Sequence, residues 1–280
     1  MTLILSCLTE HYAIQVSDRR LTLEDGSLCD DHTNKAILVN GHIVFGYTGL
    51  AFLDKGKIST GQWFVNALSE AYKAHPNVSL TTTSEFIANL ATEEVNRLNI
   101  SHELKRLAFV GIGWCKPHGQ EALKPTYIVI SNFHNADGRQ LSQAQSKFSV
   151  SVFCPPENLP VMLVSDGQVL KRALRKTVLR LLNKCTEKGL SSKTMARILV
   201  AAARNVALSN PAVGRNLLVN SIPKDSVHLG LLTLIGAPPR GGKQTFTYVP
   251  ENTELQVQYG PRVFHYGNVI DEIKSYRRQL

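Results

Sequence analysis

A threonine directly follows the initiator methionine, and this position would give one residue two functional groups. The side chain of Thr2 is small enough to permit removal of Met1, which would leave a chain that begins with a hydroxyl and a free α-amine. An α-amine has a pKa of about 7.7–8.0, so a useful fraction is neutral at working pH. Such an amine can accept the hydroxyl proton while the oxygen attacks a carbonyl carbon. Thr2 is therefore a candidate nucleophile that carries its own base.

Three further residues have types that would support this nucleophile. Lys35 would supply an ammonium that lowers the pKa of both Thr2 groups, and Asp18 would hold that ammonium in place. Gly49 ends an expected strand, so its backbone N–H would be open to a developing oxyanion. Each feature alone is common, because an Asp-Arg-Arg run is more often an ion cluster and a glycine more often a plain turn. Their joint spacing favours the catalytic interpretation.

Short strands must position these residues. Residues 2–8 and 12–18 are rich in Ile, Leu, Val and Thr and are expected to pair as a hairpin. Residues 35–39 and 42–47 flank Asn40-Gly41, a strong signal for a two-residue hairpin turn. The N-terminal part of the chain is therefore predicted to form four antiparallel strands.

Two pairs of helices alternate with the remaining strands. The helices are predicted at 61–74, from the capping-box pattern Thr82-x-x-Glu85 onward, at 167–188, and from a cap at Ser191 or Ser192. The strands are predicted at 107–113, 126–133, 147–153, 161–165, 227–235, 244–248, 256–259 and 262–266. Helices grouped in pairs favour antiparallel sheets over a doubly wound parallel sheet. The expected fold is α+β, a single domain over 1–280 with two facing antiparallel sheets flanked by helix pairs (αββα) and a C-terminal extension from about residue 237.

Charge and composition bear on partners and location. The net charge is +9, and seven lysines and arginines fall within the predicted helix 167–188. Because no aromatic stacking pattern accompanies them, a solvated helix face is favoured and nucleic acid is not the expected partner. The five cysteines are widely spaced, form no metal-binding pattern and are typical of reduced thiols. No apolar run approaches the roughly 18 residues of a membrane span, so a cytoplasmic protein is expected.

The N-terminal residues resemble the pattern of a proteasome β-type subunit, of the N-terminal nucleophile (Ntn) hydrolase superfamily. That pattern is Thr2, Asp18 with Arg20, Lys35 before the apolar strand 36–38, and the turn Thr48-Gly49-Leu50-Ala51. The order of strands and helix pairs is also similar to the αββα sandwich of this superfamily. A start at Thr2 without a propeptide is similar to the simpler bacterial members, so the chain resembles a divergent bacterial relative.

The resemblance implies a role for each of these residues. Thr2 would be nucleophile and base, with Lys35 and Asp18 as its activators. Gly49 would be the oxyanion donor, and Arg20 would brace Asp18. The reaction implied is cleavage of amide bonds, most simply in peptides or unfolded proteins, without a metal or an organic cofactor.

Two later residues and the partners are also implied by the resemblance. Ser165, in the turn ahead of the third helix, would orient the amine of Thr2. Asn205 stands near the end of the fourth helix where the family has an acidic residue, so part of the proton network would lack its negative charge. The family forms rings, which implies a homo-oligomer and a possible ATPase unfoldase as partner.

Two other functions remain open at the level of the sequence. A non-catalytic relative would keep the fold for assembly or binding and would use the basic helix. An Ntn amidase would act on a small molecule instead of a peptide. Retention of Met1 would favour the non-catalytic alternative, because Thr2 would then lack a free amine.

Overall fold

The structure is a computed structural model that describes residues 2–22, 27–31, 33–53, 57–75, 79–116, 122–156, 158–168 and 170–225, together with the backbone of five strands between 245 and 276. Met1 and the predicted strand 227–235 lie outside the described residues, as does most of the predicted C-terminal extension.

One sheet is built around the N-terminal hairpin. Its five strands run in the order β12-β1-β2-β13-β14, and each neighbouring pair is antiparallel. The strands are β1 (Leu3–Thr9), β2 (Tyr12–Asp18), β12 (Val161–Gly167), β13 (Leu217–Pro223) and β14 (Thr245–Val249). The hairpin predicted at the start of the chain therefore forms the centre of this sheet.

The second sheet contains the Asn40-Gly41 hairpin. Its seven strands run in the order β11-β10-β9-β6-β5-β16-β17. They are β5 (Ala36–Val39), β6 (Ile43–Gly49), β9 (Leu107–Cys115), β10 (Lys124–Ser131), β11 (Ser149–Phe153), β16 (Arg262–His265) and β17 (Asn268–Ile270). Asn40 and Gly41 have φ values of 50° and 69°, the left-handed conformation that a tight hairpin turn requires. The pairing of β16 with β5 is parallel, so the prediction of purely antiparallel sheets is wrong at this position.

Three short two-stranded pairs lie outside the large sheets, all antiparallel. They are β3 (Leu21–Thr22) with β4 (Leu28–Asp30), β7 (Phe52–Leu53) with β8 (Ile58–Ser59), and β15 (Val257–Tyr259) with β18 (Lys274–Tyr276).

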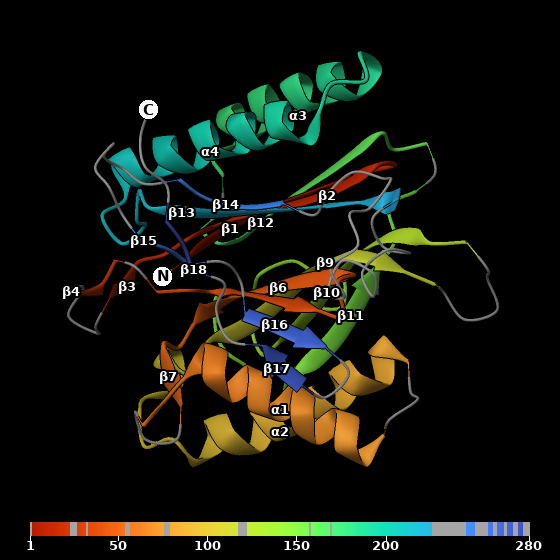
Figure 1. The fold of residues 1–280 in the computed structure, drawn as a ribbon. Coiled ribbons are helices and arrows are strands. Elements are labelled where there is room, and N and C mark those ends of the chain that lie inside the picture. Colours follow the sequence, from red (N-terminus) through yellow and green to blue (C-terminus); the bar gives the residue numbers. More distant parts are fainter. Residues whose placement is uncertain are drawn as a thin grey trace.

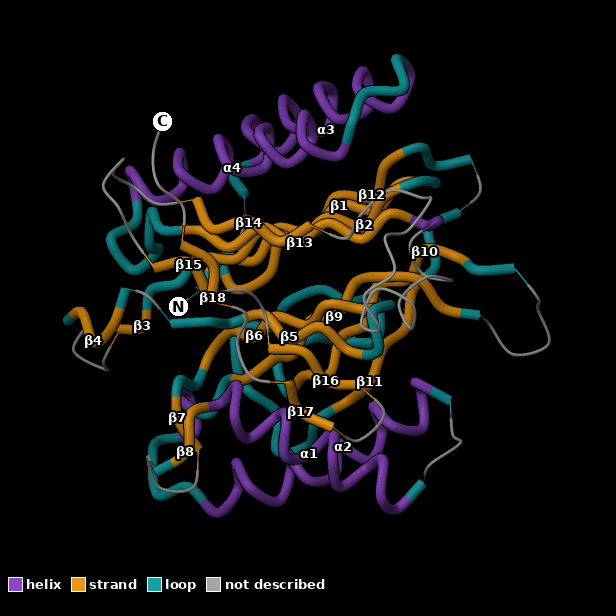
Figure 2. Tube along the Cα trace, viewed as in Figure 1, coloured by secondary structure: helices purple, strands orange, loops and turns teal. Residues whose placement is uncertain are grey.

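The described residues contain four α-helices, in two pairs. They are α1 (Thr60–Ala74), α2 (Leu80–Arg97), α3 (Arg172–Glu187) and α4 (Ser192–Ser209), and a 3₁₀ turn at His102–Leu104 follows α2. Figure 1 shows α3 and α4 over one large sheet and α1 and α2 over the other, with the two sheets facing each other, and Figure 2 shows the same arrangement by element type. No helix within the described part of the chain is both long and apolar enough to cross a membrane.

Apolar side chains form three buried clusters that account for this arrangement. One lies between α3, α4 and the five-stranded sheet, and another between α1, α2 and the seven-stranded sheet. A third joins side chains of the two sheets, among them Ile4 and Leu218 of one and Val44 and Val110 of the other. Because successive side chains of a strand point to opposite faces, each central strand contributes to two clusters.

The predicted mixed class, with helices in pairs and mainly antiparallel sheets, is confirmed. Three local predictions are wrong. Helix α2 begins at Leu80, not at Thr82, because Ser79 is its N-cap and accepts from the Thr82 N–H. Helix α3 begins at Arg172, because β12 continues to Gly167. Strand β13 was not predicted at all, and it is the neighbour of β2 in the sheet.

Candidate active site

Thr2, Asp18 and Lys35 meet in one buried contact. Lys35 Nζ donates to Thr2 Oγ1 over 2.7 Å and lies 3.3 Å from Asp18 Oδ1. The same ammonium donates to the carbonyl oxygen of Arg20. Lys35 is fully buried, and only 5% of Thr2 and 1% of Asp18 are exposed. The structure therefore brings together the three side chains predicted as the nucleophile and its activators.

Strand pairing explains how these side chains meet. Thr2 lies directly before β1, and Asp18 is the last residue of β2. Because β1 and β2 are antiparallel with Ile4 opposite Ser17, the start of β1 lies beside the end of β2. Lys35 directly precedes β5, which belongs to the other sheet. Its side chain therefore joins the two sheets at Thr2.

The carboxylate of Asp18 is buried but well supplied with donors. The backbone N–H groups of Leu3, Arg20 and Gly214 all donate to it, the one from Arg20 over 2.9 Å and the one from Gly214 over 3.5 Å. The Lys35 ammonium is its ion-pair partner. A buried carboxylate is tolerated only with such compensation, which these donors and the Lys35 ammonium supply.

The ammonium of Lys35 is in an environment that disfavours its charge. Burial lowers the pKa of Lys35 below its ordinary value, and the negative charges of Asp18, Asp31 and Asp30 oppose this shift without cancelling it. A lysine with a lowered pKa gives up its proton more readily than an exposed lysine. Because it touches Thr2 Oγ1, its charge state acts directly on the candidate nucleophile.

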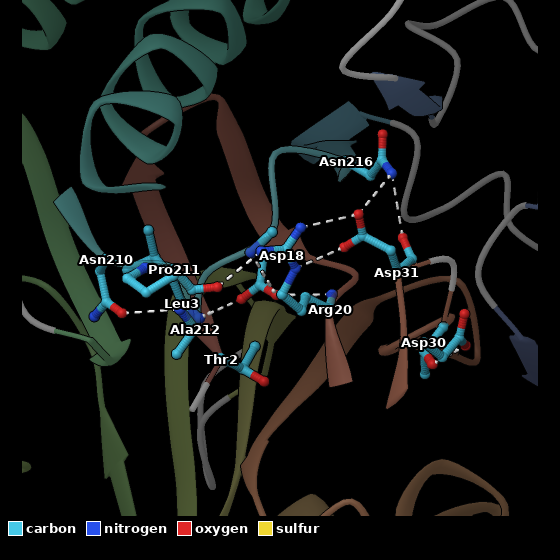
Figure 3. Close-up of polar contacts among 12 residues, drawn as sticks. Thr2, Leu3, Asp18, Arg20, Asp30, Asp31, Asn210, Pro211, Ala212 and Asn216 are labelled. Atoms are coloured by element: carbon cyan, nitrogen blue, oxygen red, sulfur yellow. Dashed lines mark hydrogen bonds and ion pairs between the residues drawn. The ribbon is translucent and has the colours of Figure 1, made fainter. Parts of the chain in front are cut away.

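The side chain of Arg20 pairs with Asp31. Its guanidinium forms a bidentate pair with Asp31, at 3.0 and 3.1 Å, and donates to the carbonyl of Pro211 over 2.7 Å. Figure 3 shows this pair next to Asp18, with Asn216 reaching Asp31 from the other side. The brace predicted between Arg20 and Asp18 is supplied by the Arg20 backbone N–H. The guanidinium connects the segments that contain Asp31 and Pro211.

The main chain of Thr2 is held by the end of β12. Its carbonyl oxygen accepts from the Gln168 N–H at 3.2 Å and from Thr48 Oγ1 at 3.4 Å. Leu3 pairs with Gly167, whose φ is +75°. A Cβ at Gly167 would lie 1.9 Å from the Thr2 carbonyl oxygen. Only glycine fits there, and the close approach places the end of β12 against the candidate nucleophile.

Gly49 lies beside the site, and the structure gives a backbone reason for the glycine. Its φ is +105°, and a Cβ would lie 1.9 Å from the carbonyl oxygen of Arg106. It pairs with Leu107 across the sheet, and the preceding Thr48 contacts Thr2. The predicted role as an oxyanion donor stays a prediction.

Ser165 and Asn205 are not brought to Thr2. Ser165 Oγ accepts from the Leu170 N–H, on the face of β12 that packs against the helices, as Leu163 does. Asn205 is exposed on α4. Gln168, near the end of the same strand, occupies the position beside Thr2 that was assigned to Ser165.

Several residues of the site were missed from the sequence. Thr48 carried a signal, because it directly precedes the assigned Gly49, whereas Gly167 was predicted as the start of a helix. Asp31, Gly214 and Asn216 carried none. Gly214 and Asn216 lie just before β13, whose pairing with β2 positions them, and Asp31 meets Arg20 only in the folded chain.

The described residues include no group of three or more His, Cys, Asp or Glu placed to hold a metal ion. Comparison with protein-family models finds no family that matches this chain, and comparison with curated proteins finds no relative.

Proposed function

We propose that this protein is an N-terminal threonine hydrolase of the Ntn type that cleaves amide bonds, with Thr2 as its nucleophile. The single observation that carries the proposal is the 2.7 Å contact between Lys35 Nζ and Thr2 Oγ1 in a buried site that also contains Asp18. Lysine side chains are seldom fully buried unless they are paired or functional. The ammonium of Lys35 donates to the Thr2 hydroxyl.

The proposed reaction needs only groups of this chain. After removal of Met1, Thr2 Oγ1 attacks the carbonyl carbon of the substrate, and its proton passes to the α-amine. The ammonium of Lys35 favours the oxygen anion as it forms, and Asp18 keeps that ammonium in place. The C–N bond then breaks, the leaving amine takes the proton, and an ester to Thr2 remains. Water hydrolyses this ester by the reverse proton route and restores the free hydroxyl.

The arrangement of the elements supports the same proposal. Helix pairs cover the outer faces of two facing sheets, and the candidate site lies between the sheets at the start of β1. We propose that this is the αββα sandwich of Ntn hydrolases. Peptides or unfolded proteins as substrates, a ring-shaped homo-oligomer and an ATPase partner follow from the resemblance alone. Sedimentation as a monomer at micromolar concentration would contradict the ring.

Intact mass and hydrolysis together test the function. We expect a purified chain that begins at Thr2 and that hydrolyses short fluorogenic peptides. Thr2→Ala should abolish the hydrolysis, and Thr9→Ala is the matched control, because Thr9 ends β1 far from Lys35 and its hydroxyl bonds only local backbone. A chain that retains Met1, or hydrolysis that survives Thr2→Ala, would contradict the proposal. Small amides cleaved in place of peptides would instead indicate an Ntn amidase.

A second candidate function is favoured by the distribution of charge. Residues 171–209, which include α3 and α4, contain ten lysines and arginines and one glutamate. Residues 60–97, which include α1 and α2, contain two basic and four acidic residues. The outer helix layer formed by α3 and α4 is therefore strongly basic, and a binding protein that holds a polyanion would use it.

Duplex DNA as a probe polyanion distinguishes this candidate. The test variant replaces Lys176, Arg180 and Lys184 by alanine, and its control replaces Lys57, Lys73 and Lys147, which lie outside this layer and are also exposed. A binding role predicts salt-dependent binding that only the α3 variant loses, with a slope of log K against log salt that falls by up to about 3. Equal loss in both variants, or no binding at low salt, would contradict this role.

A further inference from the structure

A second buried polar group lies between the sheets, beside the candidate site. Tyr127 OH donates to Asp166 Oδ1 over 2.8 Å, and His134 Nε2 lies 3.3 Å from the same oxygen. On its other side, His134 Nδ1 lies 2.8 Å from Ser131 Oγ. None of the four residues is more than 4% exposed. Tyr127 and Ser131 belong to β10 and Asp166 to β12, so the group links the seven-stranded sheet to the five-stranded sheet.

Ser131, His134 and Asp166 have the residue types of a hydrolytic triad, but their environment argues against catalysis. Ser131 Oγ accepts from the Phe133 N–H at 3.0 Å and lies 3.4 Å from the carbonyl oxygen of Leu107. The serine oxygen is thus engaged by the main chain and enclosed with the other side chains. Because these side chains are buried, a substrate cannot reach them, and their role must lie in the segments that they connect.

The group holds the end of β12. Asp166 is followed by Gly167, whose backbone lies close to the Thr2 carbonyl oxygen, and by Gln168, whose N–H donates to that oxygen. Gln140, in the segment between β10 and β11, makes a second set of contacts with the end of β12. With its amide oriented so that both polar atoms are satisfied, the nitrogen donates to Gly167 O and the oxygen accepts from Gly167 N, both over 3.1 Å.

We propose that Tyr127, His134 and Gln140 are positioning residues, which fix the Asp166–Gln168 segment and through it the main chain of Thr2. The proposal rests on the proposed function of Thr2 as nucleophile. With Met1 removed, as the proposed function requires, Thr2 is the first residue of the chain, and its position depends on the contacts of its own main chain. The contacts of its carbonyl oxygen therefore set where its hydroxyl lies relative to Lys35. A misplacement of about 1 Å can lower a reaction rate by a factor of about 100.

The hydrogen bond from Tyr127 to Asp166 persists over a wide range of pH. Burial raises the pKa of the Tyr127 hydroxyl well above its ordinary value, and the nearby Asp166 carboxylate raises it further. The phenol therefore stays protonated and remains a donor over the whole working range of pH. Asp166 is buried, so the loss of this donor leaves a carboxylate with reduced compensation.

Tyr127→Phe tests the proposal, and Trp114→Phe is its matched control. Trp114 Nε1 donates to the Ile222 carbonyl over 3.0 Å, so it is also a single buried hydrogen bond from the seven-stranded to the five-stranded sheet. It lies at the end of β9 opposite to Leu107, the residue that pairs with Gly49 beside the site. Each variant removes one such bond, and only the bond of Tyr127 reaches the segment that contacts Thr2.

The primary readout is the rate at which a β-lactone acylates Thr2, with kcat and KM for peptide hydrolysis measured separately. We expect Tyr127→Phe to lower the acylation rate and kcat on the order of 10- to 100-fold with little change in KM. Trp114→Phe should stay within about threefold of the parent protein even if its melting temperature falls equally. Equal effects of the two variants on the rate would overturn the proposal.

Hydrogen exchange provides a second readout that does not need activity. Tyr127→Phe should raise amide exchange in peptides that cover 2–5 and 165–170, and Trp114→Phe should leave both peptides protected. Unchanged protection in Tyr127→Phe would overturn the positioning role. A parent protein that does not react with the β-lactone, together with selectively raised exchange in Tyr127→Phe, would refute the function of Thr2 while the link itself stands.

Discussion

Replacement of Lys35 by methionine is the perturbation whose size follows most directly from the structure. The variant keeps an unbranched side chain of similar volume but removes the ammonium that touches Thr2, Asp18 and the Arg20 carbonyl. Asp18 then remains buried at 1% exposure with backbone donors alone. Breaking a buried ion pair by removing one partner costs about 3–5 kcal/mol. We expect a loss of that size in the free energy of unfolding, together with loss of Thr2 reactivity.

A double-mutant cycle with Asp18→Asn separates the ion pair from simple loss of packing. The variants are unfolded in urea, and the free energies are obtained by linear extrapolation. Because Asp18 and Lys35 are partners, the double variant should lose at least about 1 kcal/mol less than the sum of the two single variants. Strict additivity would refute the claim that the two charges stabilise each other.

The pH dependence of the same variant tests the buried ammonium. Burial lowers the pKa of Lys35 below the ordinary value of 10.5, so the unfolded chain binds this proton more tightly than the folded chain. The penalty is fully present below the folded pKa and is relieved as the pH rises from there toward 10.5. The stability of the parent protein relative to Lys35→Met should therefore increase with pH across that window. A relative stability that falls over this range would show that the pKa is raised instead.

Three further substitutions separate the roles of the surrounding residues. Gly49→Ala places a Cβ 1.9 Å from the Arg106 carbonyl oxygen at a φ of +105°. Thermal unfolding should therefore show that the free energy of unfolding falls by at least about 1–3 kcal/mol. Stability equal to that of the parent protein would contradict this. Arg20→Lys removes the bidentate pair with Asp31 but keeps the backbone bond to Asp18, so stability should fall by no more than about 1 kcal/mol and Thr2 reactivity should change little. Loss of reactivity in Arg20→Lys would assign the guanidinium a direct role. Thr2→Ser retains the hydroxyl and the amine and should keep measurable peptide hydrolysis, whereas complete inactivity would argue against a simple oxygen nucleophile.

The parts of the fold that local chemistry decides were predictable. Asn40-Gly41 adopts the positive φ values that its turn requires, and the pairing of β5 with β6 follows from it. Apolar residues spaced three and four apart also indicated the paired helices. The contact of Lys35 with Thr2 was predicted from residue types, their spacing and the resemblance to a known pattern. It joins two sheets, and no local signal sets their separation.

The failures have physical causes in particular residues. Strand β13 contains Asn220 and Ser221 among its apolar residues, so its pattern was weak. Its pairing with β2 depends on a partner far away in the sequence. Ser165 was misassigned because β12 extends to Gly167. The strand was predicted to end at residue 165, and its two further residues place Gln168 beside the Thr2 carbonyl oxygen in the position assigned to Ser165.

Locating the residue that a β-lactone acylates tests the central claim most directly. The account predicts a single modified peptide that begins with Thr2, carries the ester on that residue and is missing in Lys35→Met. Modification at another residue, or a Thr2 that stays unmodified in a correctly folded protein, would contradict it.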